Sequence, residues 1–279
     1  MKILEIDFGA MIFAFIGKGG VGKTTIASAA ALDLSRIGRT TLVSSDFMPS
    51  LKYLFPSNPE NLDVFELNQK EVSEKWKKTY GDEVVTVLSN LFEVEDWILD
   101  HVAESPGVAE EFMISNIMEL DSSDKYDYVV WDTAASSSTM HLIFLQKEFY
   151  DHLSRDVKIY LKLRDSIRSD KMLTLLERWR MLATNVWNQL LSTKFFLVTT
   201  GDELSIVQAG QIQEDLRTMG IEVAATICNR GGDECNDKNK FNVPENRGSA
   251  RDIVDSVSRR LIDNGMVELL RRLAKDQKV

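Results

Sequence analysis

Cysteine is scarce in this sequence, and its scarcity argues against a disulfide-stabilised fold. Only two cysteines, Cys228 and Cys235, occur among the 279 residues, so no disulfide framework is expected. Because reduced thiols are typical of the cytoplasm, we expect the protein to reside there. Cys228 lies in an apolar run, which predicts that its side chain packs in the core.

Long apolar runs and an excess of positive charge are also missing. No apolar run reaches the roughly 20 residues that a membrane-spanning helix needs. The N-terminal stretch contains Glu5 and Asp7 and lacks a small-residue cleavage site, so no signal peptide is expected. Acidic residues outnumber basic ones, 43 to 33, for a net charge of −10. This balance argues against nucleic acid as a partner, because sequence-independent binding depends on a basic surface.

The most informative segment that is present is rich in glycine. It reads Gly-Lys-Gly-Gly-Val-Gly-Lys-Thr-Thr and lies between an apolar run at Met11–Ile16 and a helical pattern at Ile26–Ile37. Strand, glycine-rich loop and helix in this order are typical of a phosphate-binding loop. The glycines let successive N–H groups point at one anion, and the helix N-terminus adds partial positive charge. The residues expected to contact the nucleotide are Gly17, Gly19, Gly20, Val21, Gly22, Lys23, Thr24 and Thr25.

Three polar side chains of this loop have separate expected tasks. Lys23 is expected to reach the β- and γ-phosphates of ATP, and the Thr24 hydroxyl to bind Mg²⁺. Lys18 follows the first glycine, where an ordinary phosphate-binding loop needs no lysine. The run resembles the deviant Walker A loop of the ATPases that include nitrogenase iron protein, MinD, ParA and the ArsA type. The resemblance implies that Lys18 crosses a homodimer interface to the partner's nucleotide. The alternative is a solvated loop lysine.

Two aspartates come directly after predicted strands. Asp46 follows the apolar run at Thr41–Ser44, and Asp132 follows the run at Tyr128–Trp131. Ligands bind at the carboxyl ends of strands in open α/β sheets. Asp132 therefore matches the Walker B aspartate, whose carboxylate binds Mg²⁺, and Asp46 is a candidate for positioning or activating water. An N-cap or loop aspartate is the alternative for Asp46. The small, polar residues 135–139 suit a loop that changes shape with the γ-phosphate.

Apolar runs and helical patterns alternate along the chain, which predicts an α/β fold. We expect a P-loop NTPase with a mostly parallel central sheet flanked by helices, plus an inserted helical subdomain. The expected strands are Ile12–Ile16, Thr41–Ser44, Leu62–Glu66, Tyr128–Trp131, Phe195–Thr199 and Glu222–Ile227, with Ile3–Ile6 as an edge strand antiparallel to Met11–Ile16.

The domain prediction is a single P-loop ATPase domain over residues 1–279 with two helical insertions. Residues 68–121 predict three helices, separated near Gly81 and near Pro106-Gly107. Residues 156–191 predict one or two long helices with a wide apolar face.

The switch segments resemble those of the ArsA-type ATPases, the family of the arsenical-pump ATPase and of the ATPase that targets tail-anchored membrane proteins. Residues 44–51 resemble switch I, and Asp46 falls on the family's catalytic aspartate. Residues 132–139 resemble switch II. The departures are Phe47-Met48-Pro49 in place of Pro-Ala-His in switch I, and residues 135–138 in place of Pro-Thr-Gly-His in switch II.

Further motifs extend the resemblance over nearly the whole chain. Residues 106–111 and 199–205 resemble two family segments, and Asn229 with Arg230 matches the Asn-Arg pair that contacts adenine. The asparagine amide offers the donor and acceptor that the adenine edge requires. The resemblance implies an ATP- and Mg²⁺-dependent ATPase that dimerises with nucleotide. The family's zinc-binding Cys-x-x-Cys is absent, so a structural zinc is not expected, and the thiols needed for arsenite activation are missing from the helical region.

The resemblance also implies a function for the helical subdomain: an apolar groove for a transmembrane segment of a client protein. Residues that suit such a groove are apolar, with adaptable methionines among them. They are Leu88, Leu91, Phe92, Trp97, Ile98, Phe112, Met113, Ile117, Met118, Met172, Leu176, Trp179 and Met181. The alternative is that these side chains form the core of their own subdomain.

The C-terminal segment at 266–275 predicts a basic amphipathic helix, which suits either transient membrane contact or docking on the core. Three function classes follow from the sequence. The first is a targeting factor or chaperone for membrane-protein segments. The others are a MinD-like membrane-cycling positioning ATPase and a regulatory ATPase acting on a folded protein.

Overall fold

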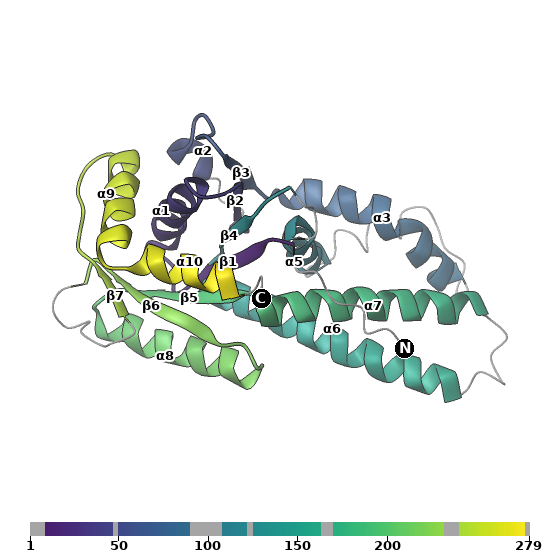
Figure 1. The fold of residues 1–279 in the computed structure, drawn as a ribbon. Coiled ribbons are helices and arrows are strands. Elements are labelled where there is room, and N and C mark those ends of the chain that lie inside the picture. Colours follow the sequence, from purple (N-terminus) through teal and green to yellow (C-terminus); the bar gives the residue numbers. More distant parts are fainter. Residues whose placement is uncertain are drawn as a thin grey trace. The chain divides into compact units, whose positions relative to one another are not determined.

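A sheet of seven strands organises the larger of two structural units (Figure 1). The computed structural model describes residues 9–46, 50–89, 108–121, 125–162, 170–231 and 240–276. The sheet unit comprises Met1–Glu66, Ile117–Met140 and Ser192–Val279, and the helical unit comprises Leu67–Asn116 and His141–Leu191. Among the described helices, none combines the length and the hydrophobicity required to cross a membrane.

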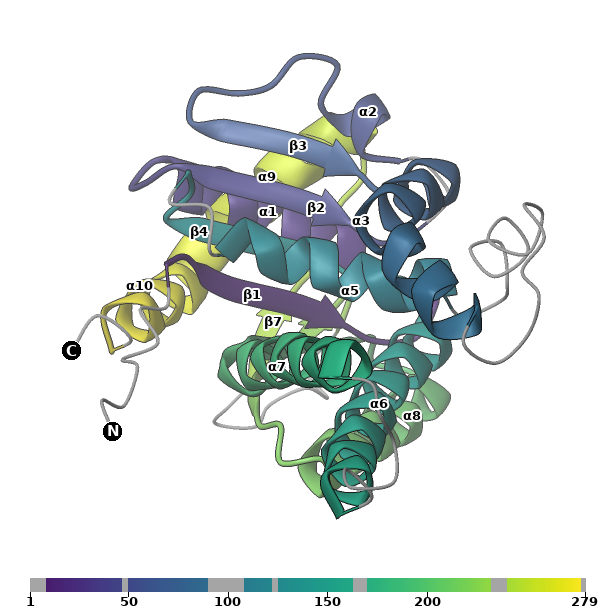
Figure 2. The ribbon, with the colours of Figure 1, turned by 90° about the vertical axis from the view of Figure 1, so that its right-hand side faces the viewer.

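Every neighbouring pair of strands in the sheet is parallel, in the order β3-β2-β4-β1-β5-β6-β7. The strands are β1 (Met11–Ile16), β2 (Thr40–Ser44), β3 (Leu62–Glu66), β4 (Tyr128–Asp132), β5 (Lys194–Thr199), β6 (Val223–Asn229) and β7 (Lys240–Val243). Figure 2 shows β3, β2, β4 and β1 side by side. The predicted α/β fold is confirmed, and its strands direct their carboxyl ends to one edge of the sheet.

Helices cover both faces of this sheet, which is why its central strands are apolar throughout. The helices of the sheet unit are α1 (Lys23–Ser35), α2 (Leu51–Leu54), α8 (Glu203–Thr218), α9 (Ala250–Asp263) and α10 (Met266–Asp276). Figure 1 shows α1, α9 and α10 on one face and α8 on the other. Every residue of β1 is buried, and Ile26 and Leu34 of α1 belong to the core cluster beside it.

The C-terminal helix α10 docks on the sheet unit with its apolar side. Met266, Val267, Leu270 and Ala274 are buried in the core cluster that also holds α1 and α9 residues. The apolar face that a reversible membrane contact would need is therefore occupied within the fold. The structure favours core docking over the membrane-contact alternative for this segment.

Six of the predicted strands are present, one predicted pairing is wrong and one strand was missed. β1 is hydrogen-bonded to β4 on one side and β5 on the other, so no edge remains for an antiparallel partner, and the predicted pairing with Met11–Ile16 is wrong. The segment Ile3–Ile6 itself lies outside the described residues. The short edge strand β7 was not predicted. It extends the sheet beyond β6, where Thr226 pairs with Lys240.

The helical unit is built from long helices: α3 (Gln69–Ser89), α5 (Val108–Asp121), α6 (Ser136–Lys162) and α7 (Asp170–Ser192). The first turns of α6 and the last turn of α5 belong to the sheet unit. α3 runs unbroken through Gly81, so the predicted helix break there is wrong. A helical glycine costs about 1 kcal/mol relative to alanine. The ring of Tyr80 meets that of Phe112 edge-on at 5.5 Å, and such packing outweighs the propensity.

Helix α6 begins at Ser136, well before the helical pattern that was recognised from residue 156. The predicted loop at residues 135–139 is therefore wrong beyond Ala135, because Ser136–Thr139 form the first turn of α6. The Thr139 backbone N–H donates to Ala135 O at 3.1 Å, and its hydroxyl donates to Ala134 O at 3.2 Å. Serine and threonine favour such first-turn positions because they satisfy free backbone groups there.

Candidate nucleotide-binding site

The glycine-rich loop lies between the end of β1 and the start of α1. Gly22 is the N-cap of α1 in the left-handed conformation, with φ 92°. Gly20 also has a positive φ of 81°. A residue with a side chain is strained in this region, so these two positions require glycine. The loop therefore curls at the N-terminus of α1, which is the geometry of an anion-binding nest.

Contacts with the ends of β5 and β6 explain why two positions of the loop have room only for glycine. A Cβ atom added at Gly17 would lie 2.1 Å from Val198 O, so the loop passes directly over the end of β5. A Cβ atom added at Gly22 would lie 2.2 Å from Nδ2 of Asn229. Gly19 has no neighbour within 4 Å of such an atom. Glycine at Gly19 is thus not required by packing, and its space is open for an approaching phosphate.

Lys23 folds back over the loop. Its Nζ donates to Lys18 O at 3.2 Å, and its side chain is buried. Burial lowers the pKa of Lys23, while the charges of Asp132 and Asp46 oppose the shift. The ammonium group is thus placed between the loop and two carboxylates, where an incoming phosphate would supply further negative charge.

Asp132 ends β4 and is completely buried. Ser44 donates its hydroxyl to Asp132 Oδ2 at 3.2 Å, and Thr24 donates a further side-chain hydrogen bond. Burial raises the pKa of Asp132 to about 6, although the Thr24 bond and the charge of Lys23 act in the opposite direction. The other oxygen, Oδ1, is buried and has no hydrogen-bond partner among the described residues.

The donor set around Asp132 fits Mg²⁺. The Thr24 hydroxyl and the Asp132 carboxylate are in contact, and both are hard oxygen ligands. The buried, unpartnered Oδ1 of Asp132 is costly without a ligand or solvent, and a cation with its waters would satisfy it. Mg²⁺ retains several waters and binds through few protein groups plus phosphates, so two protein ligands are sufficient.

Asp46 and Lys18 both lie near Lys23. The Asp46 backbone N–H donates to Ser44 Oγ at 3.2 Å, and its charge acts on both Lys23 and Asp132. The adjoining Phe47-Met48-Pro49 lies outside the described residues. Lys18 is half-buried. The pKa of Asp202 is lowered first by a hydrogen bond from Thr200 and then by one from the Ser205 backbone, and the charge of Lys18 acts in the same direction.

Ser45 was not predicted, yet it joins the two strands that carry the aspartates. Its hydroxyl accepts a hydrogen bond from Trp131 Nε1 at 2.9 Å and from the Ala134 backbone N–H at 3.2 Å. Its own backbone N–H donates to Asp132 O at 3.1 Å. Only the resemblance of residues 44–51 to switch I marked this serine, because a small polar residue after a strand has no distinctive pattern.

Asn229 and Arg230 lie at the end of β6 and hold the phosphate loop from the side. Nδ2 of Asn229 donates to Val21 O at 2.8 Å, and the Arg230 guanidinium donates to Gly20 O at 2.5 Å. Asn229 is buried, and Arg230 adopts a positive φ of 55°. The sequence predicted an adenine contact for this pair, which stays a prediction. The contacts with the loop were not foreseen, since nothing in the sequence places β6 beside it.

Cys228 precedes Asn229 on β6 and is completely buried, as expected. It is disulfide-bonded, whereas the sequence predicted no disulfide framework.

A parallel sheet, a glycine-rich loop after β1 and an aspartate at the end of the adjacent β4 define a P-loop nucleotide hydrolase. The family model of anion-transporting ATPases of the ArsA type matches residues 10–263. The chain belongs to this ATPase family.

Proteins named as arsenical pump-driving ATPases and as GET3-type ATPases are similar to parts of this chain. A putative arsenical pump-driving ATPase 2 of Aquifex aeolicus is 28% identical over 78% of this chain and 79% of that protein. ATPase GET3C of Arabidopsis thaliana is 25% identical over 77% of this chain and 65% of that protein. A putative arsenical pump-driving ATPase of Prosthecochloris vibrioformis is 34% identical over 48% of this chain, but this match spans only 35% of its own length.

Proposed function

We propose that this chain is a Mg²⁺-dependent ATPase whose nucleotide-driven dimer closure gates an apolar surface on the helical unit. In this proposal the client is a transmembrane segment of a membrane protein, such as a tail-anchored protein, which the ATPase targets or shields from water. Support comes from the ArsA-type family, from relatives named ATPase GET3C and ATPase GET3, and from the resemblance of both switch segments to the targeting ATPase.

The observation that carries the proposal is the continuity of helix α6. Its first turn follows the Asp132-Thr133-Ala134 segment at the end of β4, and the Thr133 hydroxyl donates to Phe15 O at 2.8 Å. The same helix continues to Lys162 and carries Phe144 and Phe149, two exposed apolar side chains of the helical unit. In this proposal the start of α6 responds to the nucleotide, and the same continuous helix carries an apolar surface farther along the chain.

Apolar side chains of the helical unit divide into core and surface. Of the predicted groove residues, Phe112 and Met113 are buried as core, Trp179 lines the pocket, and Met181 is 60% exposed. Exposed apolar side chains on α6 and α7 add Phe144, Phe149, Leu182 and Leu191. The side chains of Leu88, Leu91, Phe92, Trp97, Ile98 and Met172 lie outside those that the structure describes.

The proposed chemistry assigns each residue of the site one task. Lys23 and the backbone of residues 19–25 hold the phosphates, and Thr24 with Asp132 holds Mg²⁺, which neutralises charge on the β- and γ-phosphates. Asp46 positions or activates the attacking water. Lys18 completes the nucleotide site of the partner in a homodimer. The geometry of the site supports the proposed roles of Lys23, Thr24 and Asp132, whereas the family resemblance supports those of Asp46 and Lys18.

A mixed-dimer experiment tests the trans role of Lys18. Lys18→Ala and Asp46→Asn should each abolish most turnover while ATP binding persists. In a mixed dimer, the site with an intact Asp46 receives Lys18 from the Asp46→Asn subunit, so mixing the two inactive variants should restore hydrolysis at one site of each mixed dimer. If mixing restores nothing although mixed dimers form, Lys18 acts within its own subunit and the cross-interface role is wrong.

A capture experiment tests the client. The Asp46→Asn variant is co-expressed with single-span hydrophobic segments, purified with ATP and Mg²⁺, and analysed by native mass spectrometry. A stable complex of protein dimer and segment, absent for a matched segment with polar substitutions, supports the targeting proposal. A nucleotide-bound dimer without any segment would contradict it and would favour a folded protein as the client.

A further inference from the structure

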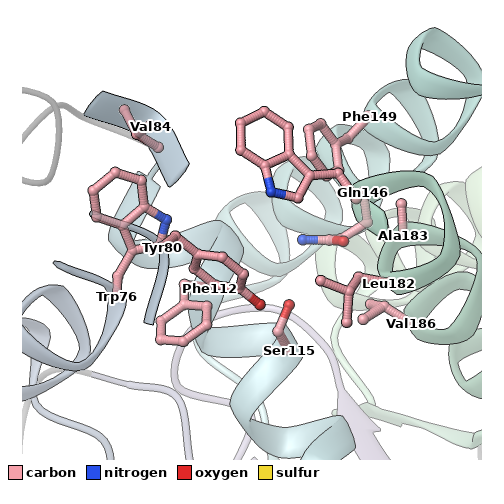
Figure 3. Close-up of a pocket in the computed structure, with 11 residues that line it drawn as sticks. Trp76, Tyr80, Val84, Phe112, Ser115, Gln146, Phe149, Leu182, Ala183 and Val186 are labelled. Carbon is pink, nitrogen blue, oxygen red and sulfur yellow. The ribbon is translucent and has the colours of Figure 1, made fainter. Parts of the chain in front are cut away.

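The helical unit contains a pocket whose walls are aromatic (Figure 3). It lies among α3, α5, α6 and α7 and has a volume of about 220 Å³. The rings around it belong to Trp76, Tyr80, Phe112, Phe149 and Trp179. Nothing in the nucleotide chemistry described above uses these side chains.

The size of the pocket limits what it can hold. An apolar cavity of about 150 Å³ accommodates benzene, whereas sites for drug-sized molecules begin at roughly 300 Å³. At about 220 Å³, this pocket lies between the two and matches a fused pair of rings. A transmembrane helix is about 10 Å wide with its side chains and cannot enter it.

Polar atoms inside the pocket define the chemistry of an occupant. Figure 3 shows the amide of Gln146 and the hydroxyls of Tyr80 and Ser115 directed into the space between the rings. Gln146 is only 4% exposed. None of the described residues that line the pocket carries a charge, so an ion would lose its hydration without a compensating partner. The pocket therefore suits a neutral molecule with one group that donates or accepts a hydrogen bond.

Contacts outside the pocket hold its walls in place. Glu83 of α3 accepts a hydrogen bond from Trp179 Nε1 of α7 at 2.7 Å and forms an ion pair with Arg178. Tyr80 and Phe112 fix α3 against α5 through their edge-on ring contact. A hollow whose walls are anchored in this way is preformed, and a preformed pocket loses little entropy when a ligand binds.

We propose that this pocket is a second ligand site, for a small, neutral, bicyclic aromatic molecule with a single hydrogen-bonding group. The rings of the ligand lie against Trp76, Phe112 and Trp179, and its polar group meets Gln146 or the hydroxyls beside it. The site requires neither nucleotide nor a protein client, so it does not depend on the function proposed above.

Isothermal titration calorimetry of the full chain with indole, without nucleotide, tests the site. Indane has the same shape without the N–H group, and indole-3-acetate adds a negative charge. We expect saturable one-to-one binding of indole, at least fivefold weaker binding of indane and at least tenfold weaker binding of indole-3-acetate. Absence of saturable indole binding at millimolar concentration, or equal affinity for all three probes, would overturn the proposal.

Variants locate the binding event. Ala183→Leu fills the pocket from α7 and should weaken indole binding at least tenfold, while Asn185→Leu, on the exposed side of the same helix, should leave it unchanged. A circular dichroism spectrum and a cooperative thermal unfolding transition like those of the wild type show that each variant is folded. If Ala183→Leu does not fold, Gln146→Leu and Tyr80→Phe decide, because one of them should reduce the preference for indole over indane. Indole affinity that none of these substitutions changes would refute the site.

Discussion

The contact between Asn229 and the phosphate loop gives a prediction that separates two roles for this residue. Nδ2 of Asn229 donates to Val21 O at 2.8 Å in a buried position, beside Gly22. Asn229→Ala removes the donor and leaves a buried carbonyl oxygen with one partner fewer. Such a loss costs roughly 1–3 kcal/mol. Because about 1.4 kcal/mol corresponds to a tenfold change in affinity, nucleotide binding should weaken roughly 5- to 150-fold if the loop must be held in place to bind phosphate.

Three ligands distinguish loop positioning from adenine recognition. Calorimetry with Mg²⁺ compares ADP, GDP and inorganic tripolyphosphate on the wild type and on Asn229→Ala. If Asn229 positions the loop, all three should weaken by a similar factor, because all three present phosphate to the same N–H groups. If it contacts only adenine, ADP alone should weaken.

A matched control uses a second asparagine of the sheet unit. Asn246 is half-buried, donates to Pro244 O at 2.9 Å and accepts from the Ser256 hydroxyl at 2.7 Å. Neither contact involves the phosphate loop, so Asn246→Ala should leave all three affinities unchanged. Unaltered binding of tripolyphosphate to Asn229→Ala, with weaker binding of ADP, would refute the positioning argument and leave the adenine contact as the role of this residue.

Two further perturbations test the loop and the Asp132 carboxylate. Gly22→Ala should abolish nucleotide binding and destabilise the fold by about 1–2 kcal/mol or more, because Gly22 has a left-handed backbone and contacts Asn229. Gly19→Ala has neither constraint and should keep the wild-type stability in calorimetric unfolding. Equal stability of the two variants would contradict the argument. Because burial raises the pKa of Asp132 to about 6 from 3.8, its contribution to stability is complete below the ordinary pKa and is lost as the pH rises through about 6. In urea unfolding without nucleotide, the free energy of unfolding of the wild type should therefore fall by about 3 kcal/mol relative to that of Asp132→Asn between about pH 3.5 and 7.5. Parallel pH profiles of the two proteins would exclude a raised pKa of Asp132.

Local patterns were enough to predict the phosphate loop, the strands around it and the two aspartates. The loop needs glycine at Gly20 and Gly22 for its backbone, and such requirements are visible in a sequence. Asp132 follows an apolar run, and all strands of a parallel sheet present their carboxyl ends at one edge. These predictions depend on residues close together in the chain.

Features that depend on distant residues were missed. Asn229 lies 208 positions from Val21, and no periodicity indicates that its amide meets that carbonyl. The unbroken α3 contradicts the local signal of Gly81, since aromatic packing overrides an intrinsic preference. The start of α6 was hidden because serine and threonine suit both a loop and a first helical turn. Tertiary context decided each of these cases.

The hydrogen bonds of Ser45 explain how one end of the sheet can act as a unit. Ser45 precedes Asp46, and its hydroxyl accepts from the backbone N–H of Ala134, two residues before α6 begins. It also accepts from the indole of Trp131, which is completely buried on β4 and cannot follow a moving loop. A displacement of Ser45 with the Asp46 segment therefore breaks the hydrogen bond to Trp131, and it also breaks the bond to Ala134 unless the Ala134 segment moves along. Each broken bond leaves an unsatisfied buried group, which costs about 1–3 kcal/mol, so joint movement is the less costly path.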